Sequence, residues 1–216
     1  MRIGVLVSGR GSNLAAILEA AARGVVPEVA LVVSNVATCP ALEIARRAGV
    51  ATRVVDPAVF AVRPDHDRAV AAALGAARVD LVCLAGYVRL IGAPLIEPFA
   101  GRILNVHPSL LPAFPGLHAP KQALDRGVRI AGCTVHFVDA GMDSGPIIAQ
   151  AAVPVLPEDS EESLAARILV EEHRLFPAAI RWIADGRVRQ EGRRAVWTDS
   201  PRAAGALESP TPGVRS

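Results

Sequence analysis

The sequence is poor in cysteine and aromatic residues and contains no long uninterrupted apolar run. It has 3 cysteines and 4% aromatic residues among 216 residues. Cys39, Cys83 and Cys133 are odd in number and far apart, which argues against a disulfide framework and against a zinc motif. Cys83 and Cys133 lie inside apolar segments. We therefore expect reduced, buried cysteines in an intracellular protein, and no metal site.

An excess of charge of either sign is also missing. The formal net charge is +2, with 20% charged and 51% hydrophobic residues, which is typical of a compact globular enzyme. No basic stripe is interleaved with aromatic residues, so nucleic acid is not an expected partner. No apolar stretch reaches membrane-spanning length, and the chain opens directly on a strand from residue 2 without a leader pattern. These features predict a cytoplasmic protein without membrane partners.

Apolar runs and alanine-rich stretches alternate along the first half of the chain. The runs 3–7, 29–33, 79–84 and 103–106 lack polar alternation, as parallel strands covered on both faces do. Between them, 14–23, 41–48 and 65–77 have helical spacing, and Pro64 suits the start of the third helix. The order predicts an α/β fold with a doubly wound, mostly parallel sheet, helices on both faces, and sites at the carboxyl ends of the strands.

The second half predicts a long amphipathic helix over 163–184, followed by a small C-terminal hairpin across Glu191-Gly192. From about residue 200 the chain is rich in Pro, Ala, Gly and Ser with few apolar anchors, which is typical of a disordered tail. We find no internal repeat and no linker between domains. We expect one domain over 1–199 and a disordered tail over 200–216.

A polar pair closes the apolar run 103–106. In Leu104-Asn105-Val106-His107-Pro108, the side chains of Asn105 and His107 project to the same side of a strand at its carboxyl end. An amide can donate to a developing oxyanion, and an imidazole can move a proton near neutral pH, as acyl-type transfer requires. The structural alternative is a polar strand end whose histidine caps a turn.

A second segment, 132–146, predicts a strand that runs into a tight loop rich in Gly, Asp and Ser. Its Asp143 can reach a neighbouring strand end, although a solvated acidic turn is the simpler interpretation. His136, within the strand, is expected to be structural or to support the site from behind. No role is assigned to His66, His118 or His173.

The first strand leads into Gly9-Arg10-Gly11-Ser12-Asn13-Leu14. Leu14 stands where a dinucleotide-binding fingerprint has its third glycine, so a pyrophosphate is not indicated. The amides of Gly11, Ser12 and Asn13 would instead face a single phosphate at a helix N-terminus. The alternative is that Ser12 or Asn13 caps this helix with its own side chain.

Several motifs in this order are similar to those of the folate-dependent formyltransferases. The resemblance covers about residues 1–199. It rests on Asn-x-His-Pro-Ser-Leu-Leu-Pro at 105–112, Asp-x-Gly-Pro at 143–146, the glycine loop 8–14, and the segments 84–89, 114–118 and 171–173 with Pro177 beyond. Four or more ordered motifs at matching spacing are a specific signal, whereas any one of them alone is weak.

The resemblance implies transfer of the formyl group of 10-formyltetrahydrofolate to the amine of 5-phosphoribosylglycinamide, a step of de novo purine synthesis. The amine would attack the formyl carbon directly, with no covalent enzyme intermediate and no metal. Asn105 and protonated His107 would stabilise the oxyanion, and Asp143 would hold the His107 proton and orient a proton-relaying water. The enzyme would act on small molecules as a monomer or homodimer.

The resemblance also implies two binding sites. Gly11, Ser12 and Asn13 would bind the ribonucleotide phosphate, and Glu172 its ribose hydroxyls. Arg63 and Arg89 would hold the glutamate tail of the folate, because arginine suits forked carboxylate recognition. Each of these arginines is otherwise interpreted as a surface charge. The folate site would comprise Arg63, Val88, Arg89, Leu90, Ile91, Asn105, Ala140 and Asp143.

Other functions remain open at this stage. Formyltetrahydrofolate deformylases usually carry an additional N-terminal domain and methionyl-tRNA formyltransferases an additional C-terminal one, and neither is expected here. A non-catalytic sugar-phosphate-binding module would need only residues 11–13. A serine hydrolase is disfavoured, because Ser109 follows His107 closely but is not on a Gly-x-Ser-x-Gly elbow.

Overall fold

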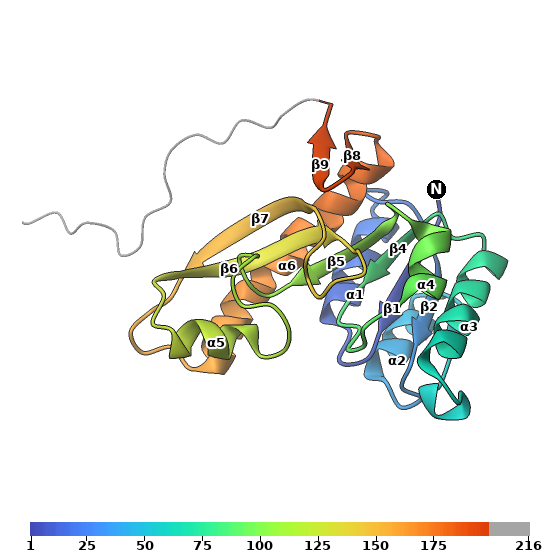
Figure 1. Cartoon of the computed structure of the whole chain (residues 1–216), viewed down its shortest axis with the longest axis horizontal. Coiled ribbons are helices and arrows are strands. Elements are labelled where there is room, and N and C mark those ends of the chain that lie inside the picture. The colour runs from blue at the N-terminus through green and yellow to red at the C-terminus, as the bar shows by residue number, and fades with distance from the viewer. Residues whose placement is uncertain (199–216) are drawn as a thin grey trace, which may run out of the picture.

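The computed structural model describes residues 1–198 as a seven-stranded sheet with helices on both faces and a separate two-stranded hairpin (Figure 1). The tail predicted to be disordered lies outside the described residues. The strands of the main sheet are β1 (Ile3–Val7), β2 (Val29–Ser34), β3 (Thr52–Val54), β4 (Leu81–Leu84), β5 (Ile103–His107), β6 (Ile130–Phe137) and β7 (Ile147–Pro154). The predicted α/β class is confirmed.

The strands follow the order β3-β2-β1-β4-β5-β6-β7. The first five are parallel, β6 runs antiparallel to β5, and β7 runs antiparallel to β6, so the sheet is mostly parallel as predicted. The order reverses between β1 and β4, whose successors lead away from each other. In open α/β sheets such a switch point opens a crevice beyond the carboxyl strand ends, where ligands bind.

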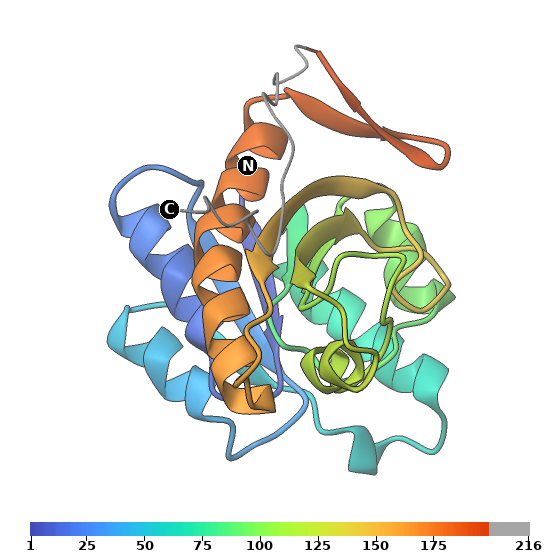
Figure 2. The same cartoon turned by 90° about the vertical axis from the view of Figure 1, so that its left-hand side faces the viewer.

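Two hydrophobic clusters lie on opposite faces of the sheet, because the side chains of each buried strand alternate between them. Ile3, Val5 and Val7 of β1 pack into the first cluster and Leu6 into the second. The first cluster is covered by α1 (Ser12–Ala22), α2 (Pro40–Arg47), α5 (Ala119–Asp125) and α6 (Glu161–Ala184). The second is covered by α3 (Arg63–Ala76), the short α4 (Ala93–Ile96) and the 3-10 turn η2 (Glu97–Phe99). Figure 2 shows α1, α2 and α6 together on one side.

The long helix α6 begins at a reciprocal cap. Ser160 Oγ accepts a hydrogen bond from Ser163 N at 3.2 Å, and Ser163 Oγ accepts one from Ser160 N at 3.0 Å. Beyond α6, β8 (Val188–Glu191) and β9 (Arg194–Trp197) form the predicted hairpin. It is tied to the helix by an edge-on contact between Trp182 and Trp197, with ring centroids 5.0 Å apart. No helix among the described residues is long and apolar enough to cross a membrane.

Candidate active site

Asn105 and His107 lie at the end of β5, with Val106 between them. Both residues pair with the antiparallel neighbour, β6. Asn105 pairs with His136 of β6, and His107 pairs with Thr134. His107 is buried and Asn105 is partly buried. The local cause is the sequence pattern: an apolar strand runs to its last residue and then meets Pro108, which cannot extend the ladder. The pair is therefore fixed on a rigid element at the carboxyl edge of the sheet.

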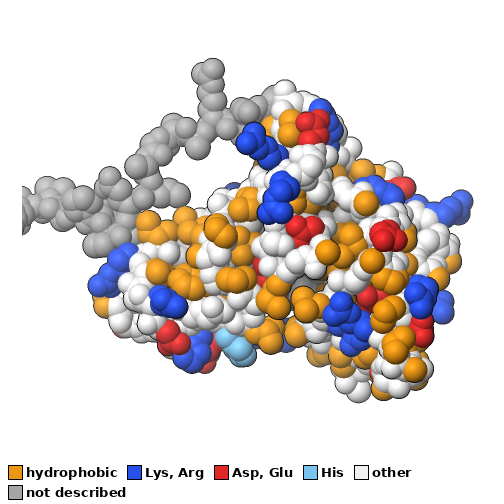
Figure 3. Space-filling view, in the orientation of Figure 1, with side chains coloured by type: hydrophobic (Ala, Val, Ile, Leu, Met, Phe, Trp, Pro, Cys, Tyr) orange, Lys and Arg blue, Asp and Glu red, His pale blue; other side chains and the backbone are white. Residues whose placement is uncertain are grey.

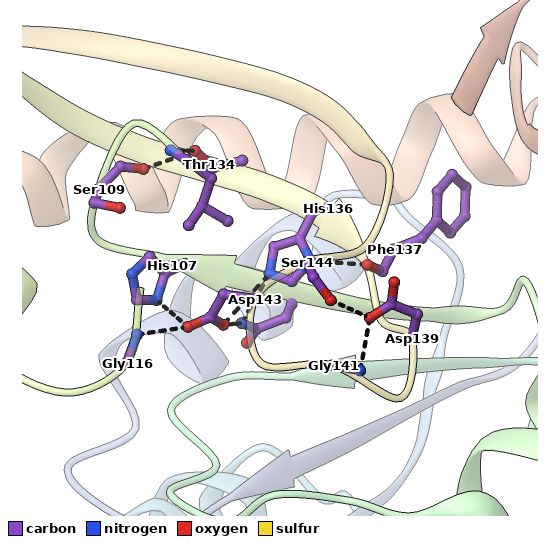
Figure 4. Close-up of polar contacts among 12 residues, drawn as sticks. His107, Ser109, Gly116, Thr134, His136, Phe137, Asp139, Gly141, Asp143 and Ser144 are labelled. Carbon is purple, nitrogen blue, oxygen red and sulfur yellow. Dashed lines mark hydrogen bonds and ion pairs between the residues drawn. The ribbon is translucent and has the colours of Figure 1, made fainter. Parts of the chain in front are cut away.

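Asp143 reaches this strand end from the loop between β6 and β7 (Figure 4). Its Oδ2 lies 3.4 Å from His107 Nδ1 and accepts a hydrogen bond from Gly116 N at 2.8 Å. Its Oδ1 accepts a longer bond of 3.5 Å from Asn105 Nδ2. Asn105, His107 and Asp143, proposed from separate segments of the sequence, thus converge on one point.

The loop that presents Asp143 is shaped by a second aspartate and a glycine. Asp139 Oδ1 accepts hydrogen bonds from Gly141 N at 3.0 Å and Ser144 Oγ at 2.7 Å, which folds the loop on itself. At Gly145 the chain returns onto β6 so closely that an added Cβ would lie 1.8 Å from the carbonyl oxygen of Phe137. Asp143 itself has φ 49°, a left-handed conformation rare outside glycine. Strained backbone of this kind clusters at functional sites.

The ring nitrogens of His107 have two different partners. Nε2 lies 2.8 Å from the carbonyl oxygen of Phe114, which only accepts, so Nε2 carries a proton. Nδ1, the other ring nitrogen, faces the Asp143 carboxylate. A proton on Nδ1 is held between imidazole and carboxylate, and its charge lies next to the Asn105 amide.

His136 lies directly behind Asn105. Its Nδ1 is 2.8 Å from the carbonyl oxygen of Phe137, so Nδ1 donates, and the lone pair of Nε2 accepts from Asn105 Nδ2 at 3.2 Å. Burial lowers the pKa of His136 below its ordinary value, despite the nearby carboxylate of Asp143. A neutral His136 therefore fixes the rotamer of Asn105, with the amide nitrogen turned toward His136 and Asp143.

Ser109 plays a structural part in the loop that follows β5. Its hydroxyl is buried and donates to the carbonyl oxygen of Ala113 at 2.5 Å. Its own carbonyl oxygen accepts from Thr134 Oγ1 at 2.7 Å. A hydroxyl committed to a backbone carbonyl and lacking a hydrogen bond to His107 is not set up as a nucleophile, in agreement with the sequence argument against a serine hydrolase.

The start of α1 forms a second polar site. The helix is capped by Gly11, and no side chain caps its first turn, so the alternative that Ser12 or Asn13 serves as a side-chain cap is wrong. Asn13 Nδ2 instead donates to Glu172 Oε2 of α6 at 2.7 Å. Burial raises the pKa of Glu172, against the lowering effect of this bond. The structure thus joins the two segments predicted to hold the ribonucleotide.

Position 11 of this loop has no room for a side chain. Its φ is 83°, and a Cβ added there would lie 2.6 Å from the Cβ of Ala41 and 2.8 Å from its Cα. The close approach of α2 to the glycine loop therefore requires glycine at this position. No side chain makes a capping hydrogen bond at the start of α1, so the amides of its first turn keep their capacity to bind an anion.

Apart from Asn105 in β5, the predicted folate residues lie on the loop 85–92, on the Asp143 loop and at the start of α3. In the loop 85–92, Val88 and Leu90 are 63% and 51% exposed, and Ile91 is buried. Arg89 is partly buried, and within residues 1–198 no group accepts a hydrogen bond from its Nε, which is itself buried. Arg63 is exposed at the start of α3, with Nη2 3.5 Å from the position of a Cβ built on Gly92. Ala140 is exposed on the Asp143 loop.

Two backbone groups of the site were not visible in the sequence. The Phe114 carbonyl binds His107, and the Gly116 amide binds Asp143. Gly116 has φ 82°, and Phe114 and His118 also take left-handed conformations. The sequence signals for this loop are the motif 114–118 and its turn pair Pro115-Gly116, which mark the segment but not the backbone atoms that it presents. Among the described residues, no cluster of three or more His, Cys, Asp or Glu side chains is arranged to hold a metal ion.

Residues 1–180 match the family described as formyl transferase. The chain belongs to the formyl transferase family. Within it, the chain is 43% identical over 203 residues to phosphoribosylglycinamide formyltransferase of Escherichia coli K12, which covers 94% of this chain and 95% of that protein. The crystal structure of glycinamide ribonucleotide transformylase 1 from Symbiobacterium toebii is 57% identical, with a TM-score of 0.91, over 92% of this chain and 94% of that one.

Some members of the formyl transferase family are much longer. The chain is 48% identical over 188 residues to the trifunctional purine biosynthetic protein adenosine-3 of Drosophila melanogaster, a match that covers 86% of this chain but 14% of that protein. A formyltetrahydrofolate deformylase from Pseudomonas syringae shares the fold with a TM-score of 0.83 at 27% identity, and the chain covers 66% of it. The similarity is thus higher, and extends over whole proteins, with the family members that formylate the ribonucleotide.

Proposed function

We propose that this protein transfers the formyl group of 10-formyltetrahydrofolate to the amine of 5-phosphoribosylglycinamide in de novo purine synthesis. The observation that carries the proposal is the convergence of Asn105, His107 and Asp143 at the carboxyl end of β5. The end-to-end similarity to phosphoribosylglycinamide formyltransferase of Escherichia coli supports the choice of substrates. A module that only binds a sugar phosphate does not require this convergence.

The proposed reaction is a direct attack of the amine nitrogen on the formyl carbon. The electron pair of the carbonyl moves to oxygen, and the oxyanion receives hydrogen bonds from Asn105 Nδ2 and from the protonated His107. Collapse re-forms the carbonyl and breaks its bond to N10 of the folate. The amine loses a proton and N10 gains one, relayed by a water that Asp143 orients.

The geometry of Asn105 suits this part. Its bond to His136 at 3.2 Å is shorter than its bond to Asp143 at 3.5 Å. The shorter bond holds the plane of the amide, while the longer and weaker one is the N–H that can turn to a developing oxyanion at little cost. The neutral state of His136 is essential here, because a protonated ring would donate rather than accept.

Each substrate has residues suited to its charged parts. The ribonucleotide phosphate would lie against the amides of Gly11, Ser12 and Asn13, where the dipole of α1 favours an anion, and Glu172 would bind the ribose hydroxyls. Arg63 and Arg89 would bind the glutamate tail of the folate. A buried guanidinium donor without an acceptor costs about 1–3 kcal/mol, so an arriving carboxylate is a favourable partner for Arg89. Val88, Leu90, Ile91, Asn105, Ala140 and Asp143 would surround the pterin.

We propose a cytoplasmic enzyme that acts on small molecules, uses 10-formyltetrahydrofolate as co-substrate, needs no metal, and works as a monomer or homodimer. The three cysteines are free and buried, which suits a reducing compartment. On the face seen in Figure 3, Lys and Arg side chains are scattered among hydrophobic and acidic ones. Such a face offers little to a nucleic acid or an anionic membrane.

The test is an absorbance assay of tetrahydrofolate release, run with and without 5-phosphoribosylglycinamide. We expect release only with the amine present, at one product per formyl group transferred. Release without the amine would instead indicate a deformylase. A third arm replaces the amine by methionyl-tRNA, and formylation of that acceptor would contradict the proposal. The Asp143→Asn variant controls for background hydrolysis in each arm.

A further inference from the structure

The loop 85–92 is held in place by two side chains that come from outside it. Ser8, the first residue after β1, accepts a hydrogen bond from Val88 N on its Oγ at 2.9 Å. Ser8 N also donates to the carbonyl oxygen of Gly86 at 3.1 Å. At the other end of the loop, Asp67 Oδ2 of α3 accepts from Gly92 N at 2.8 Å. The loop carries Val88, Arg89, Leu90 and Ile91 between these points.

Ser8 lies at the switch point of the sheet, where the ends of β1 and β4 are neighbours. Its hydroxyl has one proton, and this proton is used in a bond to Asn35 Oδ1 at 2.6 Å. The lone pairs of Oγ are therefore oriented to receive the Val88 amide. Asn35 follows β2, so the contact links the ends of three adjacent strands. An alanine at position 8 would leave the Val88 amide without this acceptor.

Asp67 is a buried carboxylate in the first two turns of α3, beneath the same loop. Its relative exposure is 1%, and its Oδ1 lies 3.5 Å from Nδ1 of the fully buried His66. His66 Nε2 lies 3.0 Å from the carbonyl oxygen of Val55, so Nε2 donates, and the ring is locked in place. Burial of a carboxylate costs free energy unless it has hydrogen-bonding or charged partners, so Asp67 is expected to bind specific groups.

Asp67 also acts on Tyr87, a buried residue of the loop 85–92. Burial raises the pKa of the Tyr87 hydroxyl, Arg89 opposes this, and Asp67 adds to it. The guanidinium of Arg89 and the carboxylate of Asp67 therefore both lie near the Tyr87 hydroxyl. Gly92 is packed against the same group, because an added Cβ would lie 3.1 Å from Asp67 Oδ2. Asp67 thus supports the loop from the side opposite to its exposed residues, Val88 and Leu90.

We propose that Ser8 and Asp67 are positioning residues for the folate, which fix the backbone of the loop 85–92 so that Arg89 and its neighbours present a preformed surface. The proposal rests on the proposed function for the identity of the ligand. It does not make either side chain a contact of the folate. Each acts through one backbone amide, Val88 N or Gly92 N, and the loss of either bond would be expressed as weaker binding rather than slower chemistry.

The experiment compares variants that remove each acceptor with variants that keep it. Ser8→Ala and Asp67→Ala remove the acceptor, whereas Ser8→Thr and Asp67→Asn keep an oxygen at the same position. Ser163→Ala is the matched control, since it also removes a serine acceptor of a backbone amide at 3.0 Å, but at the start of α6. Two quantities are measured on the full chain: the Kd for tetrahydrofolate by calorimetry, and hydrogen exchange of the segment 85–92.

We expect Ser8→Ala and Asp67→Ala to weaken tetrahydrofolate binding by about tenfold, which corresponds to about 1.4 kcal/mol, and to speed exchange in the segment 85–92. Ser8→Thr, Asp67→Asn and Ser163→Ala should stay within about threefold of the parent Kd. The Kd for 5-phosphoribosylglycinamide should be unchanged throughout, which a general loss of structure would not allow. If Asp67→Ala fails to fold, Ser8→Ala decides alone.

Unchanged exchange in Ser8→Ala would overturn the proposal, and so would faster exchange with a parental Kd for tetrahydrofolate. Equal weakening in the acceptor-keeping variants would also overturn it, because the acceptor would then not be the cause. A parent protein that binds no tetrahydrofolate would refute the proposed function instead. In that case exchange alone still decides whether Ser8 and Asp67 hold the loop.

Discussion

Asp143 combines an unusual backbone with three polar contacts, and both features guide the choice of substitution. Its left-handed φ of 49° is tolerated by asparagine at least as well as by aspartate. Asp143→Asn therefore keeps the loop and the acceptor for Gly116 N, but removes the charge beside His107 Nδ1. We expect kcat to fall by about 10²–10³, with the Kd of either substrate within about threefold of the parent. Steady-state kinetics and calorimetry measure the two quantities.

The matched control for this prediction is Glu161→Gln, which neutralises a carboxylate that pairs with the exposed His118 at 3.2 Å. Its kcat should equal that of the parent. Should Asp143→Asn retain kcat within about tenfold of the parent, Asp143 would be an acidic residue of a turn, and the proton relay would have to be assigned elsewhere.

His136 gives a pH dependence of stability whose sign follows from its burial. The folded protein holds the pKa of His136 below its ordinary value of 6.5, whereas the unfolded chain does not. As pH falls below 6.5, the unfolded state takes up a proton that the folded state refuses, so the free energy of unfolding decreases. The stability is present in full above this value and is lost as pH falls through the folded pKa.

Replacement of His136 should remove its contribution to the pH dependence of the free energy of unfolding. We expect urea unfolding to show a smaller loss of stability between about pH 7.5 and about pH 5.5 for His136→Gln than for the parent. Other titrating groups, such as Glu172 and His173, are common to both proteins and cancel in the comparison. A parallel loss in both proteins would mean that His136 titrates in the folded state as it does in the unfolded one.

The residue scale also shows where sequence-based prediction stops. Asn105, His107 and Asp143 carry side chains whose chemistry identifies them. Asn105 and His107 lie where an apolar run ends, and Asp143 lies in a loop whose Gly, Asp and Ser residues mark it as a tight turn. Phe114 and Gly116 contribute only backbone atoms, which every residue has, so composition and spacing gave no reason to select them. Ser8 and Asp67 were missed for a related reason, since each acts on an amide distant in sequence.

At the level of elements, the continuous apolar strands were predictable, and the edges of the sheet were not. β1, β2, β4 and β5 are buried on both faces, so each appears in the sequence as a short continuous apolar run, which predicts a buried strand. β3 has three residues, two of them exposed, and β7 is an edge strand in which buried and exposed positions follow no regular alternation. Neither has an intrinsic signal strong enough to separate it from a loop. The antiparallel direction of β6 depends on pairing across the sheet, which local patterns do not contain.

Alanine substitution of two glycines, Gly75 and Gly145, should change the free energy of unfolding in opposite directions. Gly75 lies in α3 with open space where a Cβ would stand, so Gly75→Ala should raise the free energy of unfolding by about 0.5–1 kcal/mol through helix propensity. Gly145→Ala would place a Cβ 1.8 Å from the Phe137 carbonyl oxygen, where β6 and the Asp143 loop meet. It should destabilise the protein strongly and reduce kcat by displacing Asp143. Urea unfolding of both variants measures the difference, and a Gly145→Ala protein as stable as the parent would show that this close approach is absent.

At the scale of the whole molecule, the proposed catalytic residues lie between two proposed binding sites built from different parts of the fold. The proposed ribonucleotide site joins α1 to α6 through Asn13 and Glu172, on the face covered by the first hydrophobic cluster. The loop 85–92, proposed to bind the folate, follows β4 and packs Tyr87 and Ile91 into the second cluster, on the other face. The carboxyl end of β5 adjoins β4 in the sheet, so Asn105 and His107 are held where the two substrates can meet.

This division predicts that the two sites respond independently to substitution. Glu172→Gln should raise the KM for 5-phosphoribosylglycinamide and leave that for the folate unchanged, and Arg89→Ala should do the reverse, because each side chain grips a part remote from the reacting carbon. Since the two residues lie on opposite faces and share no partner, the double variant should show both effects multiplied, with a coupling below about 0.5 kcal/mol. A complete double-mutant cycle of kcat/KM for each substrate measures the coupling. A larger value would mean that one site is reshaped when the other is altered, and Ser8, which links the ends of β1 and β4 next to the glycine loop, would be the first residue to test as the connection.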